Sequence, residues 1–228
     1  MKINKYFTKT ELGIWLSSVL VILSAFFIFD GEKYLNMLAS LIGTTALIFC
    51  AKGNPLGQAL IIIFASLYAY ISLSFKYYGE MMTYLGMSLP MAVVALISWI
   101  KNPSKKSKAE VKVNTLSKKE ILFAFILSLV ITFIFYFILK ALGTANLIIS
   151  TVSITTSFFA AYLTFRRSEY FALAYALNDI VLIIMWTMAM VSNIQYISVV
   201  ICFLVFLVND TYSYINWRKM KVRQQDAE

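Results

Sequence analysis

The sequence has no histidine and only two cysteines among its 228 residues. Without histidine there is no Ser-His-Asp triad, no Cys-His pair and no zinc site with imidazole ligands. Cys50 and Cys202 both stand inside long apolar runs and form no Cys-x-x-Cys motif, so we expect small buried side chains. We therefore expect neither a metal centre nor a cofactor.

Charged residues are also scarce, at 14% of the chain, whereas 61% of the residues are hydrophobic. Soluble domains usually have about 45–50% apolar and about 25% charged residues, so the composition predicts an integral membrane protein. The net charge of +9 does not indicate a nucleic-acid partner, because the basic residues stand in short connections and form no basic face interleaved with aromatic rings.

The apolar runs predict an all-α fold, because about 20 apolar residues span a bilayer as a helix. Eight transmembrane helices are expected at 12–29, 34–51, 56–75, 80–100, 119–140, 145–165, 168–191 and 194–217. The one long connection runs from Lys101 to Lys119. Its seven lysines predict a solvated and largely disordered linker.

Lysine and arginine are unevenly divided between the two sides that eight crossings would create. Seventeen of the 20 fall on the side that holds both termini, and only Lys33, Lys76 and Lys140 fall on the other. Cytoplasmic loops carry an excess of basic residues. The distribution therefore predicts a multi-pass protein of the plasma membrane with both termini in the cytoplasm.

The order of helices and turns occurs twice. Residues 34–102 and 145–217 each contain a helix, a short basic turn, a helix, a short loop and a helix that ends in tryptophan. This predicts two parallel three-helix repeats joined by a basic linker and a linker helix at 103–144, a layout similar to that of SWEET-type carriers. Residues 1–33 would add an extra N-terminal helix and 218–228 a cytoplasmic tail. Two unrelated bundles remain the alternative.

Asn-Asp pairs interrupt the last two apolar segments, at 178–179 and 209–210. A carboxylate near the middle of a bilayer costs at least about 2.5–3.5 kcal/mol, so these pairs need a polar interior. Polar and aromatic side chains at helical spacing in four segments are the candidates to line it. The expected substrate-binding residues are Tyr68, Glu80, Tyr84, Tyr175, Asn178, Asp179, Trp186, Asn209, Asp210 and Tyr212.

Other polar and aromatic side chains have simpler explanations. Trp99 and Trp217 stand near segment ends, where we expect them to anchor the helices in the membrane interface. Pro90 stands within a predicted helix and is expected to free a backbone carbonyl near Gly86. Glu80 has the alternative role of complementing a helix dipole.

The candidate residues suit a flat, hydroxyl-bearing solute that is neutral or cationic. Aromatic faces can stack on a cationic ring, and amides and carboxylates can bind hydroxyl groups. Away from their ends, the predicted membrane segments contain no lysine or arginine that could pair with a phosphate. Phosphorylated solutes are therefore disfavoured.

Three stretches resemble the PnuC family of nicotinamide riboside transporters: YYGEMMTYLGMSLPMAVVALISWIKN (77–102), NDIVLIIMW (178–186) and ICFLVFLVNDTYSYINW (201–217). The resemblance covers about residues 34–217. It implies a SWEET-like fold, a homotrimer in the lipid bilayer, and uptake of nicotinamide riboside by facilitated diffusion through a site between the repeats. It also implies trapping of the solute by a cytoplasmic kinase that makes no stable contact with the carrier.

The chain departs from the family pattern at positions associated with substrate recognition. Phe171 and Ala174 stand where many members have a Trp-x-x-Trp pair, Tyr84 stands where asparagine is frequent, and Ala92 stands where glutamine follows Pro-Met. Another vitamin or nucleoside, such as thiamine, riboflavin or a deoxynucleoside, therefore remains an alternative cargo.

Two hypotheses come from other functional classes. An intramembrane aspartyl enzyme would use Asp179 and Asp210 as a dyad, but the chain lacks the expected Gly-x-Gly-Asp pattern. A structural subunit would have no cavity between 34–102 and 145–217. A transporter without enzymatic activity is the favoured prediction.

Overall fold

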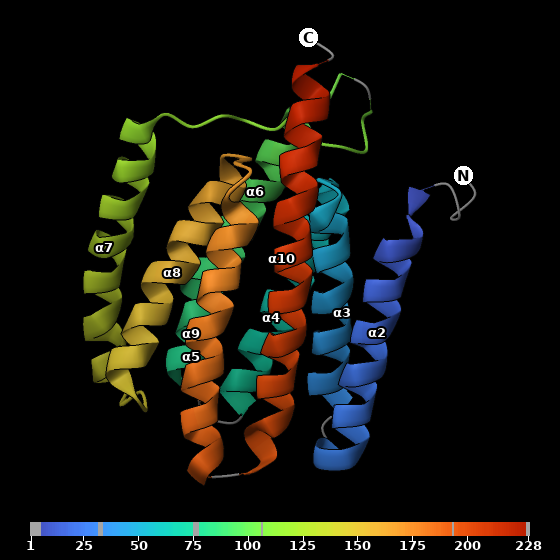
Figure 1. Cartoon of the computed structure of the whole chain (residues 1–228). Coiled ribbons are helices and arrows are strands. Elements are labelled where there is room, and N and C mark those ends of the chain that lie inside the picture. The colour runs from blue at the N-terminus through green and yellow to red at the C-terminus, as the bar shows by residue number, and fades with distance from the viewer. Residues whose placement is uncertain (1–5, 32–33, 75–77, 106, 193, 227–228) are drawn as a thin grey trace.

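The computed structural model describes residues 6–31, 34–74, 78–105, 107–192 and 194–226 as an all-helical bundle (Figure 1). In order, the elements are α2 (Lys9–Ala25), η1 (Phe26–Asp30), α3 (Tyr34–Ala51), α4 (Pro55–Ser74), α5 (Tyr78–Thr83), η2 (Tyr84–Ser88), α6 (Leu89–Lys101), α7 (Lys118–Ala141), α8 (Leu147–Phe165), α9 (Phe171–Ser192), η3 (Ile194–Tyr196) and α10 (Ile197–Gln225).

Within the described residues, eight helical spans are long and apolar enough to cross a membrane. The π-helical turn η1 extends α2, and α5, η2 and α6 together form one span, Tyr78–Lys101. The eight predicted segments are therefore confirmed, with ends that differ by a few residues. The largest difference is in α10, which continues past Trp217 to Gln225.

Polar residues at the helix starts explain several of these boundaries. Thr8 and Glu11 form a reciprocal capping box at the start of α2, and Ser117 accepts a hydrogen bond from the Glu120 backbone at the start of α7. Such caps satisfy backbone N–H groups that have no partner within the helix. Pro55 is the first residue of α4, where its missing N–H costs nothing.

The helices form two groups of three that face each other. In one group α4 packs against α3 and α6, and in the other α9 packs against α8 and α10. The groups meet where α10 lies beside α3 and where α6 lies beside α8. α7 packs on α8 and α2 packs on α3 and α10, at opposite edges of the bundle (Figure 1).

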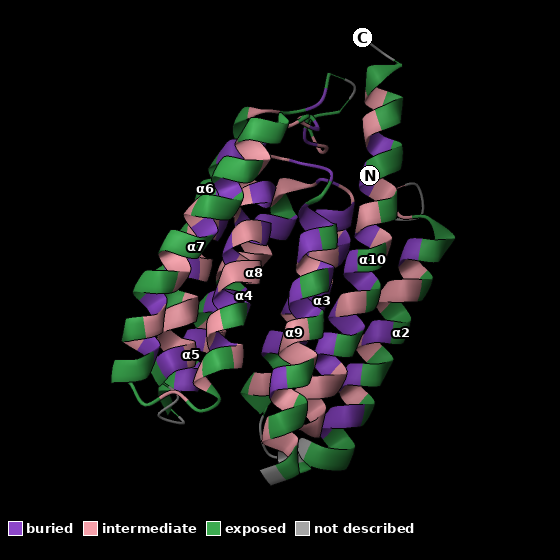
Figure 2. Ribbon diagram, turned by 60° about the vertical axis from the view of Figure 1, so that its left-hand side comes forward, coloured by how far each residue is buried: buried purple, intermediate pink, exposed green. Residues whose placement is uncertain are grey.

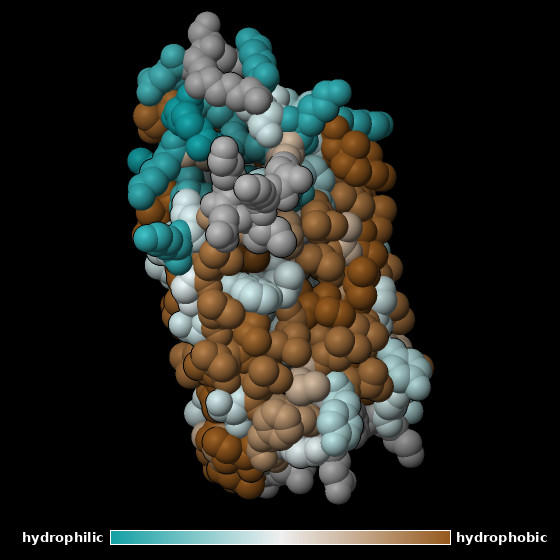
Figure 3. All heavy atoms as spheres, turned by 90° about the vertical axis from the view of Figure 1, so that its right-hand side faces the viewer, coloured by the Kyte–Doolittle hydropathy of each residue, from teal (hydrophilic) through white to brown (hydrophobic). Residues whose placement is uncertain are grey.

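The outer surface is apolar along the length of the bundle. α7 shows mostly exposed and half-buried residues (Figure 2), and Phe133 on this helix is 66% exposed. The hydrophilic residues gather at the end of the bundle that holds both termini (Figure 3). Of the lysines expected on the opposite side, Lys140 lies in the last turn of α7, whereas Lys33 and Lys76 lie outside the described residues.

The described residues between α6 and α7 pack on the bundle, so the expectation of a solvated and largely disordered linker is wrong. We call residues 103–105 and 107–114 the strap. Val111 is fully buried and its N–H donates to Gly53 O at 2.9 Å, in the turn between α3 and α4. The Asn114 N–H donates to Arg167 O at 2.9 Å, in the turn between α8 and α9. Two buried valines, Val111 and Val113, fix the strap, because they pack into the bundle while Lys105, Lys108 and Lys112 are exposed.

The two tryptophans predicted as interface anchors are instead fully buried, so that prediction is also wrong. Trp99 donates to Thr164 O and Trp217 donates to Cys50 O, both at 2.8 Å. A buried indole N–H needs an acceptor, and carbonyl groups in the last turns of α8 and α3 supply one here. With Phe171 these rings close the end of the bundle beneath the strap.

Candidate functional site

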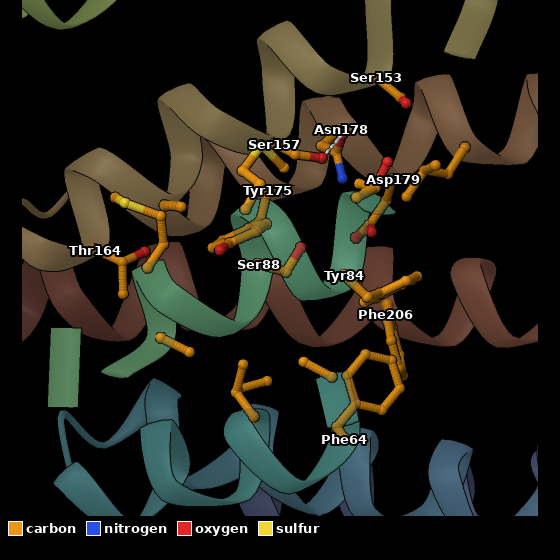
Figure 4. A pocket seen from close by; sticks show the side chains of 18 of the residues that line it. Phe64, Tyr84, Ser88, Ser153, Ser157, Thr164, Tyr175, Asn178, Asp179 and Phe206 are labelled. Carbon is orange, nitrogen blue, oxygen red and sulfur yellow. Dashed lines mark hydrogen bonds between the residues drawn. The ribbon is translucent and has the colours of Figure 1, made fainter. Parts of the chain in front are cut away.

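A cavity of about 140 Å³ lies between the two groups of helices (Figure 4). Residues of α3, α4, α6, α8, α9 and α10 line it, together with residues of α5 and η2. One buried water needs about 10–15 Å³ by the same measure. The cavity can therefore hold a solute of many atoms rather than a few structural waters.

Two carboxyl groups meet on the α9–α10 side of the cavity. Asp179 and Asp210 are both 3% exposed, and their side chains hydrogen-bond to each other. Asp179 Oδ2 has no hydrogen-bond partner among the described residues. A third carboxyl group, that of Glu80, lines the cavity from α5.

These acidic groups have no basic counterpart in the cavity wall. Within the described part of the chain, no lysine or arginine lines the cavity. Buried carboxyl groups are stabilised by positive charge within about 4–6 Å. The site is therefore suited to a cation and unsuited to a phosphate. No group of three His, Cys, Asp or Glu side chains among the described residues is placed to hold a metal ion.

The neighbour of this pair, Asn178, is held by hydroxyl groups of α8. Its Oδ1 accepts hydrogen bonds from Thr156 Oγ1 at 2.7 Å and from Ser157 Oγ at 2.9 Å. In Figure 4 the Asn178 amide nitrogen points toward the part of the cavity where Asp179 is drawn. The amide group therefore meets the cavity with a fixed orientation.

Aromatic rings form the remaining recognition surface. Tyr84 and Phe64 line the cavity with ring centroids 6.1 Å apart, and Tyr175 lies beside Phe171 at 6.4 Å. Tyr84 begins the π-helical turn η2, which ends two residues before Pro90. Proline cannot donate to the carbonyl four residues earlier, and a π turn accommodates that loss and is frequent at functional sites.

The structure brings six of the ten predicted site residues to the cavity wall. They are Glu80, Tyr84, Tyr175, Asn178, Asp179 and Asp210. They come from three of the four segments that the sequence analysis expected to line a polar interior. Their role in binding remains our proposal.

The other four predicted residues do not line this cavity. Tyr68 stacks on Tyr84 at 5.0 Å and Trp186 on Tyr196 at 5.3 Å. Asn209 donates to Ser18 Oγ at 3.0 Å, toward α2, and half-buried Tyr212 lies beside Thr8 and Glu11. Consecutive residues of a helix point about 100° apart. On α10 the neighbouring helix α2 covers the face that carries Asn209, so only Asp210 of the pair lines the cavity.

Sequence analysis missed the polar side chains that α8 and α4 contribute. Gln58 of α4 and four hydroxyl residues of α8 line the cavity: Ser150, Ser153, Ser157 and Thr164. The many serine and threonine residues of α8 indicate a polar interior face, because lipid offers hydroxyl groups no hydrogen-bond partner. The place of Phe64 and Phe206 in the cavity wall could not be predicted from sequence, since phenylalanine occurs throughout the chain.

The known proteins that this chain is similar to are transporters, as a cavity inside a membrane-spanning bundle suggests. Residues 33–219 match the family described as nicotinamide mononucleotide transporter. The chain is 31% identical over 216 residues to the nicotinamide riboside transporter PnuC of Neisseria mucosa, covering 92% of this chain and 82% of that protein. It is 24% identical over 212 residues to the PnuC protein of Haemophilus influenzae, covering 92% and 90%.

A crystal structure of the vitamin B3 transporter PnuC has the same fold. The TM-score is 0.83 at 28% sequence identity, over 96% of this chain and 94% of that chain. These relatives are transporters, so neither the aspartyl-enzyme hypothesis nor the structural-subunit hypothesis is favoured. A match over most of the chain, together with an acidic cavity inside the membrane-spanning bundle, shows that this protein belongs to the nicotinamide mononucleotide transporter family.

Proposed function

We propose that this protein carries nicotinamide riboside across the membrane by facilitated diffusion, with the binding site in the cavity between the two three-helix groups. Both named relatives are nicotinamide riboside transporters. The observation that carries the proposal is a cavity lined by three carboxyl groups and several aromatic rings, and by no basic side chain in the described residues.

The charge of the cavity distinguishes the riboside from the mononucleotide in the family's name. Nicotinamide riboside has a positively charged pyridinium ring, a ribose with hydroxyl groups and no phosphate. Its ring can stack on Tyr84 or Tyr175 and its charge can pair with the carboxyl groups. A phosphate would meet like charges in a medium of low dielectric constant, where repulsion is strong.

Thiamine is the second candidate cargo because its thiazolium ring is also cationic. The acidic pair Asp179–Asp210 would stabilise that ring in the same way. Riboflavin and deoxynucleosides are neutral and would gain less from the carboxyl groups. The cavity therefore ranks cationic precursors above neutral ones.

The biological setting follows from the same family and from the charge distribution. We infer that the protein lies in the plasma membrane with both termini in the cytoplasm, because 17 of the 20 lysines and arginines fall on the side of the predicted spans that holds both termini. We also infer assembly as a homotrimer. A cytoplasmic kinase that never binds the carrier stably would phosphorylate the solute and so keep it inside.

Uptake into proteoliposomes tests the function. Vesicles with purified protein should equilibrate radiolabelled nicotinamide riboside down its gradient, and an excess of nicotinamide mononucleotide should not compete. Thiamine and a deoxynucleoside serve as comparison solutes. Failure to equilibrate the riboside would refute the assigned cargo, and uptake abolished by an uncoupler would refute facilitated diffusion.

A further inference from the structure

The amide of Asn178 has one orientation that satisfies its neighbours on α8. Thr156 Oγ1 lies 2.7 Å from Asn178 Oδ1 but also 3.1 Å from Ser153 O. Its single hydroxyl hydrogen could therefore serve either acceptor. Thr156 alone would tolerate the Asn178 amide in either orientation.

Ser157 removes that freedom. Its hydroxyl lies 2.9 Å from Asn178 Oδ1, and the described residues offer that hydrogen no other acceptor. If the amide were turned around, Ser157 would face an N–H group and its own hydrogen would lose its protein acceptor. One lost hydrogen bond costs about 0.5–1.5 kcal/mol, so the oxygen faces α8 and the N–H₂ group faces the cavity.

The fixed amide completes a pattern of donors and acceptors. Asn178 offers N–H donors next to Asp179 and Asp210, whose carboxyl groups line the same wall. A carbonyl or ether oxygen of a solute would suit the amide, and a hydroxyl group or positive charge would suit the carboxyl groups.

We propose that Ser157 and Thr156 are positioning residues for transport: they hold Asn178 so that the cavity presents an N–H donor beside its two aspartates. The solute class selected in this way has a hydrogen-bond acceptor close to a cationic or hydroxyl-bearing group. This inference rests on the proposed function, since its measurements use nicotinamide riboside as the ligand.

The first test measures calorimetric binding of nicotinamide riboside to purified full-length variants. Ser157→Ala should raise Kd about 3- to 10-fold, since one hydrogen bond is lost, and Ser157→Thr should restore binding. Thr155→Val is the matched control, because Thr155 lies on the same helix but bonds to Thr132 of α7 at 2.8 Å. It should leave Kd within about 1.5-fold of the wild type.

A double-mutant cycle with Asn178→Ala separates positioning from a structural role. If Ser157 acts through Asn178, Ser157→Ala should change Kd by less than about 2-fold in the Asn178→Ala background. An equal loss in both backgrounds would overturn the proposal, as would unchanged binding in Ser157→Ala itself. If the single Asn178→Ala variant does not fold, Kd values for Ser157→Ala, Ser157→Thr and Thr155→Val still test the proposal. A Kd of Ser157→Ala equal to that of Thr155→Val would overturn it.

The outcomes for the wild type keep the two proposals apart. A wild-type protein that neither binds nor carries the riboside refutes the proposed function. A wild-type protein that carries it, with additive effects in the cycle, refutes only the positioning role of Ser157 and Thr156.

Discussion

Trp99 and Trp217 face each other with ring centroids 5.3 Å apart, and each donates a hydrogen bond to the opposite group of helices. Trp99 of α6 donates to Thr164 O of α8, and Trp217 of α10 donates to Cys50 O of α3. Both carbonyl groups belong to the second-last residue of their helix. This reciprocal exchange supports the proposal that 34–102 and 145–217 are related repeats.

The turns that follow the two accepting helices are also alike. Gly53 has a φ of 63° and Arg167 a φ of 56°, and their N–H groups donate to Cys50 O and Thr164 O at 2.9 and 3.0 Å. A left-handed residue at this position is a common helix ending. The strap binds both turns in the same way: the Val111 N–H donates to Gly53 O, and the Asn114 N–H donates to Arg167 O.

We predict that each tryptophan stabilises the contact between the two groups. Trp99→Phe and Trp217→Phe should each lower the free energy of unfolding by about 0.5–1.5 kcal/mol through the lost hydrogen bond. Trp217→Ala should cost about 3–5 kcal/mol because it also leaves a cavity. Thermal unfolding in detergent measures these changes, and Phe variants that unfold at the wild-type temperature would contradict the prediction.

We predict that the paired carboxyl groups bind the charge of the solute. The double variant Asp179→Asn/Asp210→Asn should weaken binding of nicotinamide riboside about tenfold or more, because the hydrogen-bonded pair then has no negative charge to face the cation. The neutral dihydropyridine form of the riboside should be affected much less. Glu169→Gln is the control, since Glu169 pairs with Lys221 outside the cavity. Equal losses for charged and neutral ligands would contradict charge pairing.

We predict that Gln224 holds the strap to α10. Its amide accepts from the Val113 N–H at 2.9 Å and donates to Glu110 Oε1 and Val111 O at 2.8 and 3.0 Å. Gln224→Ala should release the strap and speed tryptic cleavage at its lysines, because proteases cut opened segments. Gln225→Ala changes an exposed neighbour and should leave the cleavage rate unchanged. Equal rates for both variants would show that the strap does not depend on Gln224.

We predict that Gly57 permits the close packing of α3 and α4. A Cβ atom at this position would lie 2.6 Å from Cys50 N and 3.0 Å from Ala46 O, so backbone would have to move. Gly57→Ala should therefore destabilise the protein by about 1–3 kcal/mol or more. Gly13→Ala is the matched control: nothing lies within 4 Å of its added Cβ, and alanine in a helix gains up to about 1 kcal/mol. A thermal shift of the same sign in both variants would contradict this account.

The local pattern of the sequence determined the membrane class, the eight helices and the polar faces of α9 and α10. Apolar runs of about 20 residues have one stable form in a bilayer, because each backbone group must be bonded within its own segment. For the same reason a buried Asn-Asp pair such as Asn178-Asp179 signals an interior site from sequence alone. The resemblance of three stretches to a transporter family added the expected cargo.

Only the tertiary structure decided which polar groups share the cavity and how its closed end is built. Asn209 and Asp210 are adjacent in sequence, but the packing of α2 against α10 turns one away and leaves the other in the cavity wall. Trp99 and Trp217 stand near the ends of predicted helices, where interface anchors are common, but the structure buries them against each other. Which side chains face the interior depends on how each helix is rotated about its axis and on which helices pack against it. Both depend on residues that are far apart in the chain.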